Sequence, residues 1–245
     1  MSAAYGPTFR AGFIWNDSDY VTAPPLRSLA GLGKIWTQLG VTEQYYPALH
    51  SAFWLQHKLW GDAPLGYHLA TVAFHALAAL LLWRVLLRLG VRGAWLGAML
   101  FALHPVCVES VAWIAEQKNT LSLLLYLAAA LAYLRHREQP SAARYAMATG
   151  LFIVALLTKS VTATLPPALL VAFWWQKGRL TWSDVRPLLP WFAAGAVFGL
   201  FSAWVEHAIV GAKGAHFDLS WPGRFVLAGR IVWFYLGKLV WPANL

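Results

Sequence analysis

The chain has 245 residues, of which 59% are hydrophobic and only 12% are charged, and its formal net charge is +9. Soluble domains carry about 25% charged residues, so this composition excludes an ordinary soluble domain and indicates a lipid environment. The positive charge does not indicate nucleic acid as a partner, because the basic residues lie in short loops at helix ends. A single cysteine, Cys107, excludes an internal disulfide and a cysteine metal cluster.

Residues 1–66 predict a polar outer loop that contains interfacial helices. Apolar side chains recur at helical spacing from Leu26 to Leu39, and a second apolar stretch runs from Leu49 to Trp60. Both stretches are rich in Trp and Tyr, which favour headgroup depth, and prolines separate them. We therefore expect two helices that lie on the outer leaflet.

Residues 67–245 predict a bundle of membrane-spanning helices. A span needs roughly 20 apolar residues, or fewer if it is tilted or re-entrant. The candidate spans are Tyr67–Leu89, Ala94–Val108, Thr120–Leu134, Tyr145–Thr158, Val161–Trp175, Leu188–Ile209 and Phe225–Val240. The predicted fold class is therefore all-α, a polytopic membrane helical bundle with about seven transmembrane helices.

The loops between these segments are sorted by charge. Three loops carry nine bases and only two acids, Glu138 and Asp184. The bases are Arg84, Arg88, Arg92, Arg135, Arg137, Arg144, Lys177, Arg179 and Arg186. The other loops carry the remaining acids, which are Asp17, Asp19, Glu43, Asp62, Glu109, Glu116, Glu206 and Asp218. The positive-inside rule then predicts a multi-pass protein of the cytoplasmic membrane whose acid-bearing face points outward.

Asp17 and Asp19 form the first candidate site. They are two residues apart, so in an extended loop their carboxylates would point the same way, between Trp15 and Tyr20 at the membrane boundary. Close carboxylates beside a low-dielectric surface suit a general base or a cation site. The alternative is a solvated Asx-type turn.

Residues 104–119 form the second candidate site. Glu109 and Glu116 are seven apart, which on a helix places both on one face with Trp113 between them. Such polar groups at a membrane mouth are costly unless they are used or paired. The polar residues of this mouth are His104, Glu109, Glu116, Lys118 and Asn119. The alternative is helix capping with a Glu116–Lys118 pair.

Lys159 lies between two predicted spans and precedes the hydroxyls of Ser160, Thr162 and Thr164. A lysine beside a helix start could hold a lipid phosphate, or it could only snorkel to the headgroups. Pro166-Pro167 predicts a kink in the following helix, which would leave a lateral cleft for a lipid tail.

Further polar residues mark the outer ends of other segments. Glu206 and His207 lie at the end of one span, Arg230 lies in the last one, and His50 lies in the outer loop. No His, Asp and Glu set has metal-ligand spacing, and the chain has neither a phosphate-binding glycine loop nor a nucleophile elbow. Soluble nucleotide-sugar or ATP chemistry is therefore not expected.

Several motifs together resemble a known family. They are "YYPALHSAFWLQHKLWG", "LFALHPVCVESVAWIAEQKN", "LLTKSVTATLPP" and "WVEHAIVGAKG" with "AGRIVWFYLGKLVWPANL". In order and spacing they resemble the bacterial relatives of the transmembrane-and-TPR protein O-mannosyltransferases. These are GT-C-fold glycosyltransferases that take sugar from a polyprenyl-phosphate donor outside the cytoplasmic membrane. Relative to the family, the chain looks like a fragment without the first span and the C-terminal TPR part.

The resemblance implies roles for particular residues. Asp17 matches the catalytic acid of the first outer loop, although Asn16 and Ser18 stand where the family often has carboxylates. Glu109 matches the glutamate of an HPxxxExV motif, and Lys159 matches the lysine before the hydroxyl-rich turn.

The expected reaction is transfer of a sugar, with mannose the first choice, to a hydroxyl of a protein or glycan. Asp17 would be the base, Asp19 would orient the acceptor or bind a cation, and Lys159 with Arg230 would hold the donor phosphate. The expected pocket residues are His50, His104, Glu109, Glu116, Lys118, Asn119, Glu206 and His207. No cofactor is required, and a divalent cation at Asp17 and Asp19 is left open.

The rival interpretation is a non-catalytic membrane protein, either a transporter or a lipid-presenting scaffold. A transporter should place ionisable groups near the bilayer midplane, whereas here they lie mainly at the outer boundary. The enzyme hypothesis requires Asp17, Glu109 and Lys159 to converge on one outer cavity that is open to lipid.

Overall fold

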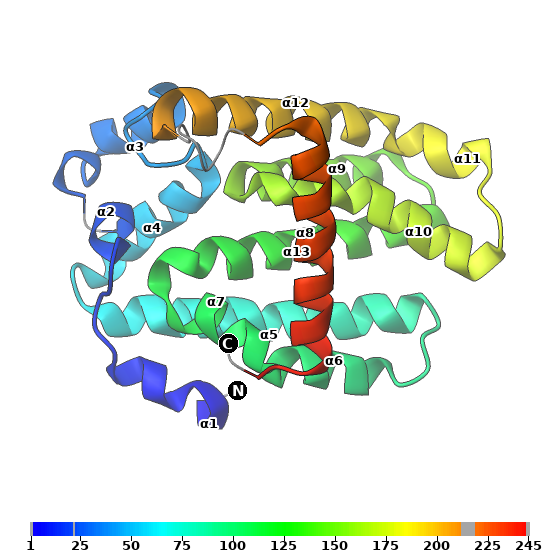
Figure 1. Ribbon diagram of the computed structural model, residues 1–245, viewed down its shortest axis with the longest axis horizontal. Coiled ribbons are helices and arrows are strands. Elements are labelled where there is room, and N and C mark those ends of the chain that lie inside the picture. The colour runs from blue at the N-terminus through cyan, green and yellow to red at the C-terminus, as the bar shows by residue number, and fades with distance from the viewer. Residues whose placement is uncertain (1, 22, 212–218, 244–245) are drawn as a thin grey trace.

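The structure is a computed structural model, and it describes residues 2–21, 23–211 and 219–243. Every regular element in these ranges is helical, as the sequence predicts. The helices form a bundle of roughly parallel and antiparallel rods, and the segment before residue 64 covers one end of it (Figure 1).

The first 60 residues contain the two predicted helices and several shorter ones. The elements are α1 (Ser2–Tyr5), η1 (Gly6–Arg10), α2 (Asp17–Val21), η2 (Pro24–Leu26), α3 (Leu29–Thr37) and α4 (Pro47–Trp60). Ser28 caps α3 by accepting a hydrogen bond from the Gly31 amide, and Pro47 begins α4, where its missing N–H is not needed. The expected helices of the outer loop are thus confirmed as helices.

Each of the seven apolar segments contains a helix. The main helices are α5 (Pro64–Arg88), α6 (Ala94–Leu103), α8 (Gln117–Glu138), α9 (Ala142–Thr158), α10 (Leu165–Lys177), α12 (Leu189–Val205) and α13 (Trp221–Val240). Within the described ranges, only α5 and the helical stretch Trp182–Val210 are each long and apolar enough to cross a membrane. A bent pair, Ala94–Leu103 with Pro105–Ala112, would provide a third span. The structure therefore shows a helical protein with two or three candidate spans, and not seven.

The predicted segment Ala94–Val108 is interrupted at Pro105. Helix α6 ends at Leu103, His104 is extended, and the chain continues as η3 (Pro105–Cys107) and α7 (Val108–Ala112) after a bend of 51°. Proline disfavours a helical conformation in the residue before it and lacks an amide donor, which explains the break.

The predicted kink at Pro166-Pro167 is absent. The chain forms η5 (Ser160–Thr164), and α10 then begins at Leu165 with both prolines in its first turn. First-turn amides have no partner within a helix, so prolines there begin a helix without bending it.

The core of the bundle is built from α5, α8, α9, α10 and α12. Trp191 is buried and stacks on Phe152 at 4.6 Å between ring centroids, and its indole N–H donates to Thr149 at 2.9 Å. A buried polar contact ties α4 to the bundle, because Gln117 donates to Gln56 at 3.2 Å and to Thr71 at 2.9 Å. The partnered amides make this junction specific without an unsatisfied polar group.

The two ends of the bundle differ in charge, as the loop pattern predicts. We call the end with residues 104–119, Lys159 and Glu206 the acidic end, on the left of Figure 1. The basic end, on the right, carries the connections 89–93, 139–141 and 178–181, together with α11 (Trp182–Val185) and η6 (Arg186–Leu188). Asp218 lies outside the described residues.

Helix α13 runs across the other helices instead of parallel to them (Figure 1). None of its residues is buried. The His104 ring nitrogen Nε2 lies 3.0 Å from the Leu239 carbonyl oxygen, which links the C-terminal part of α13 to the break after α6.

Candidate functional site

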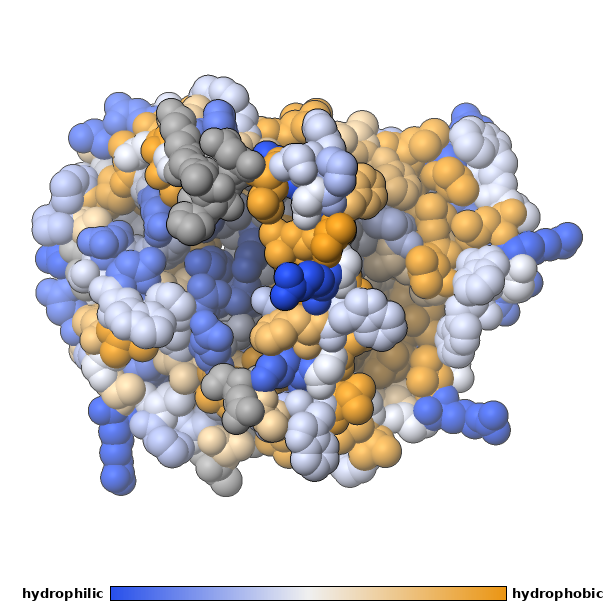
Figure 2. Space-filling model, in the orientation of Figure 1, coloured by the Kyte–Doolittle hydropathy of each residue, from blue (hydrophilic) through white to orange (hydrophobic). Residues whose placement is uncertain are grey.

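A cavity of about 950 Å³ opens at the acidic end beneath α13. Figure 2 shows a hollow beside α13 in which hydrophilic residues gather, while the surface towards the basic end is largely hydrophobic. The lining residues come from the 105–110 segment, the start of α8, the end of α9 and α13. They are Pro105, Val106, Val108, Glu109, Ser110, Glu116, Asn119, Lys159, Phe234, Tyr235 and Lys238.

Glu109 and Glu116 both reach this cavity, but not from one helix. Helix α7 ends at Ala112, Trp113 is extended, and η4 (Ile114–Glu116) follows. The predicted shared helix face is therefore wrong. The bend brings the two glutamates to the cavity from different segments, which seven-residue spacing cannot reveal.

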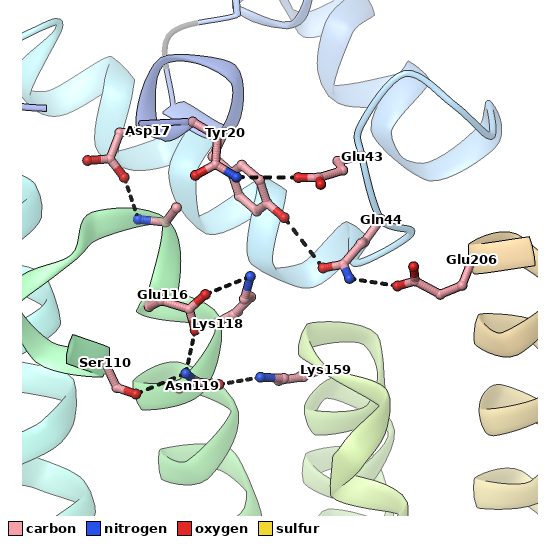
Figure 3. Close-up of polar contacts among 12 residues, drawn as sticks. Asp17, Tyr20, Glu43, Gln44, Ser110, Glu116, Lys118, Asn119, Lys159 and Glu206 are labelled. Atoms are coloured by element: carbon pink, nitrogen blue, oxygen red, sulfur yellow. Dashed lines mark hydrogen bonds and ion pairs between the residues drawn. The ribbon is translucent and has the colours of Figure 1, made fainter. Parts of the chain in front are cut away.

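Asp17 holds this bend from the outside. One carboxylate oxygen accepts a hydrogen bond from the Ala115 amide at 2.7 Å (Figure 3). The other accepts from the Ile14 amide at 2.9 Å. The side chain is 1% exposed and does not line the cavity. Burial raises the pKa of Asp17, and the two amide hydrogen bonds only partly oppose that shift.

The prediction that Asp17 and Asp19 point the same way is wrong. Both lie in the short helix α2, where residues two apart face nearly opposite directions, and Asp19 is exposed while Asp17 is buried. Trp15, just before this helix, has a left-handed φ of 48°, which costs about 1 kcal/mol for a non-glycine residue. The Asp17–Ile14 hydrogen bond spans this strained turn and stabilises it.

A hydrogen-bond network crosses the floor of the cavity and is centred on Asn119. Its amide nitrogen donates to Glu116 and to the Ser110 hydroxyl, and its amide oxygen accepts from the Lys159 ammonium (Figure 3). Glu116 also forms an ion pair with Lys118 at 2.9 Å. The predicted Glu116–Lys118 pair is thus confirmed, and Glu116 has its charge compensated.

Lys159 lines the cavity, and its ammonium contacts the neutral side-chain amide of Asn119. Burial lowers the pKa of Lys159, the nearby Glu116 opposes that shift, and Lys118 adds to it. Because Asn119 carries no charge, its hydrogen bond orients the ammonium without neutralising it. The positive charge of Lys159 is therefore available to an anion in the cavity.

Glu109 is the exposed carboxylate of the same cavity. Its side chain has no ion-pair or hydrogen-bond partner among the residues that the structure describes. The cavity thus offers a cation whose direct contact is a neutral amide and, among the described residues, a carboxylate without an ion pair.

Comparison with known sequences identifies the family. Residues 47–206 match the family described as dolichyl-phosphate-mannose-protein mannosyltransferase, which is well over half of the chain. The chain belongs to this mannosyltransferase family. The matched region includes Glu109, Glu116, Asn119 and Lys159 but not Asp17.

Curated relatives are protein O-mannosyl-transferases of animals. The chain is 34% identical over 175 residues to Tmtc1 of Drosophila melanogaster, which covers 65% of this chain and 20% of that protein. It is 26% identical over 170 residues to TMTC3 of Mus musculus, covering 64% of this chain and 18% of that protein. The chain therefore spans about a fifth of the length of these relatives. No solved structure matches the chain.

Several residues predicted for the site lie outside this cavity. Arg230 is exposed on α13 and does not line the cavity, and His207 is exposed after α12. Glu206 accepts a hydrogen bond from Gln44 at 2.7 Å, which fastens the outer segment to α12. Lys118 pairs with Glu116 and lies 5.4 Å from the Tyr20 ring centroid.

His50 belongs to the packing of the outer helices. It is 3% exposed, it stacks against Tyr20 at 5.2 Å, and burial lowers its pKa to about 4. His104 precedes Pro105, which lines the cavity, and it contacts α13 through Leu239. Neither residue lines the cavity.

The sequence analysis missed the contributions of Ser110, Phe234, Tyr235 and Lys238 to the cavity. Ser110 follows the predicted Glu109 directly, so its proximity was available from the sequence. Lys238 lies eight residues after Arg230 on α13, and only the placement of that helix shows which of the two basic residues reaches the cavity.

Proposed function

We propose that the protein transfers mannose, within the acidic-end cavity, from a dolichyl-phosphate or similar polyprenyl-phosphate donor to a hydroxyl group of a protein. The observation that carries this proposal is the meeting of Lys159 and Glu109 in one cavity of about 950 Å³ within the family-matched region. Such a volume suits a sugar and part of its acceptor.

Lys159 takes the role of holding the donor phosphate. Charge develops on the phosphate oxygen as the bond to the sugar breaks, and a preorganised cation lowers the energy of that transition state. The neutral contact with Asn119 supports this role, because an ion pair with a carboxylate would compete with the phosphate. Lys238 lines the same cavity and adds positive charge.

Glu109 is the base that the geometry supports best. The acceptor oxygen forms a bond to C1 of mannose, the bond from C1 to the phosphate oxygen breaks, and the hydroxyl proton passes to the Glu109 carboxylate. The dolichyl phosphate leaves with the bonding electron pair and its negative charge beside Lys159. Glu109 lines the cavity and is exposed to it, which a base needs in order to reach the acceptor.

Asp17, the base implied by the family resemblance, remains a prediction. Its carboxylate lies outside the cavity and is occupied by two amide donors, which supports a positioning role for it. It holds the bend that presents Glu116 to the cavity. A divalent cation also remains a prediction.

The mannose itself has polar and aromatic partners in the cavity. The Ser110 hydroxyl, the Glu116 carboxylate and the Asn119 amide are placed to bond sugar hydroxyls. Phe234 and Tyr235 of α13 supply ring surfaces in the same cavity. Sugars commonly bind between a polar face and such rings, because their C–H faces are apolar.

The remaining expectations concern the bilayer. We propose that all seven apolar helical segments lie in or across the cytoplasmic membrane, with the acidic end outward. The separation of the bases from the acids at the two bundle ends supports this orientation. The same separation argues against a transporter, because the charged groups described here cluster at the ends and not along a central pathway.

Transfer of labelled mannose from dolichyl-phosphate mannose to a Ser/Thr peptide tests the proposal. The chain is reconstituted in nanodiscs, and its activity is compared with that of Glu109→Gln. Transfer by the chain, with a large loss in the variant, is the expected result. If neither protein transfers mannose, or if both transfer it equally, the cavity is not the reaction site.

A further inference from the structure

The basic end contains a second pocket that the transfer reaction does not use. Its volume is about 520 Å³, and it lies between the end of α8, the start of α9 and the α11–η6 segment. The residues that line it are His136, Tyr145, Ser183, Arg186 and Pro187. It therefore combines a cation, a hydroxyl and an imidazole with an apolar wall of one ring and one proline.

The acids near this pocket are neutralised by other bases. Asp184 is 2% exposed and accepts from Lys177 at 2.6 Å and from Arg137 at 2.8 Å, and Glu138 pairs with Arg88. Burial disfavours charge on Asp184, but the hydrogen bonds from Lys177 and Thr181 outweigh it and lower the pKa of Asp184 to about 2. Neither acid is left to compensate Arg186.

Arg186 is exposed, and its side chain has no ion-pair partner among the residues that the structure describes. The Tyr145 hydroxyl donates to the Pro187 carbonyl at 2.7 Å and so fixes the η6 segment against α9. The pocket is therefore a built feature, with its cation carried by a segment that is fastened in place.

We infer that this pocket binds the headgroup phosphate of an anionic phospholipid, with Arg186 as the main cation. A guanidinium matches two phosphate oxygens at once. The surroundings favour a lipid over a soluble phosphate, since Trp182 is 65% exposed beside the pocket and Leu189 and Met147 are also exposed. Exposed tryptophans are typical of headgroup depth, and the apolar side chains provide contacts for acyl chains.

Lipid binding to the purified chain tests this inference and does not depend on mannose transfer. The delipidated protein is mixed with equal amounts of phosphatidylglycerol and phosphatidylcholine, and the bound lipids are counted by native mass spectrometry. We expect phosphatidylglycerol to be preferred, and Arg186→Gln to reduce that preference about fivefold, as for loss of one base near an anionic surface.

The controls separate a site from a diffuse charge effect. Arg179→Gln removes an exposed base of the same end that does not line the pocket, and it should leave the preference nearly unchanged. Arg186→Lys should restore part of it. Circular dichroism confirms that each variant is folded.

Three results would overturn the inference. Equal losses in the Arg179 and Arg186 variants would show general attraction to the basic end. Equal binding of both lipids by the unaltered chain would show that the pocket does not select charge. Displacement of phosphatidylglycerol by millimolar inorganic phosphate would assign the pocket to a soluble anion.

Discussion

Buried and half-buried charged groups have different partners at the two ends of the bundle. At the basic end, the buried Asp184 is bound by two cations and by the capping hydroxyl of Thr181. At the acidic end, Lys159 is held by the neutral amide of Asn119, and Asp17 is held by backbone amides with no cation. The charge of Asp184 is therefore compensated by its neighbours, whereas the direct contact of Lys159 leaves its charge available.

This difference separates charges that stabilise the fold from charges that are free to act on a ligand. A fully paired buried carboxylate fixes the geometry of its neighbours, but it has no remaining affinity for a ligand. A partly buried ammonium with a neutral partner is oriented in advance and keeps its charge.

The largest expected effect distinguishes the two candidate bases. Glu109→Gln should lower kcat about a thousandfold, because proton transfer to a positioned carboxylate contributes 10²–10⁴-fold. Asp17→Asn leaves one amide without its acceptor, and it should lower the free energy of unfolding by about 1–3 kcal/mol. Transfer assays together with denaturant unfolding separate the effects. A thousandfold loss in a stably folded Asp17→Asn protein would restore Asp17 as the base.

Asp184 and Glu138 offer a matched test of pairing at the basic end. Asp184→Ala should lower the free energy of unfolding by about 3 kcal/mol, because it removes the helix cap and leaves Arg137 and Lys177 without their acid. Glu138→Gln removes an exposed pair and should cost less than about 1 kcal/mol. Denaturation in micelles measures both, and equal losses would contradict the proposed role of burial.

The sequence predicted the elements of the fold better than it predicted the site. Apolar runs and loop charges identified the helices and the two ends of the bundle. The pattern did not show that Pro105 breaks α6 or that Pro166 begins α10 without a kink, because the effect of a proline depends on where the helix starts. The same spacing rules misplaced Glu116, because the Asp17 carboxylate accepts a tertiary hydrogen bond from the Ala115 amide at the bend. They misplaced Asp19 because residues 17–21 are helical and not extended.

The two buried aspartates should change the free energy of unfolding with pH in opposite directions. The pKa of Asp184 falls from 3.8 to about 2, so its contribution of about 2 kcal/mol is complete above pH 4 and is lost as the pH falls towards 2. Burial raises the pKa of Asp17, so its contribution to the free energy of unfolding is present in acid. That contribution declines as the pH rises through the raised pKa of Asp17. The free energy of unfolding is measured from pH 2 to 7. The Asp184→Ala variant should lack the rise in stability between pH 2 and 4, and the Asp17→Asn variant should lack the decline that the raised pKa of Asp17 causes.

A smaller effect should follow from placing a charge beside Lys159. Asn119→Asp should raise the KM for the donor about tenfold, because the new carboxylate pairs with the ammonium. It should also shift the alkaline loss of donor binding to higher pH, since the carboxylate raises the pKa of Lys159. Asn119→Ser removes the hydrogen bond to Lys159 without adding charge. It should change the KM less, and it should hardly shift the pH at which donor binding is lost. Identical profiles for both variants would contradict an electrostatic role.

The availability of the Lys159 charge is tested most directly by binding of dolichyl phosphate to the chain in nanodiscs. We expect Lys159→Met to weaken this binding at least tenfold, whereas Arg179→Gln at the basic end leaves it unchanged. Binding that is equally tight in the Lys159 variant, or equally weakened in both variants, would contradict the assignment of the acidic-end cavity as the donor site.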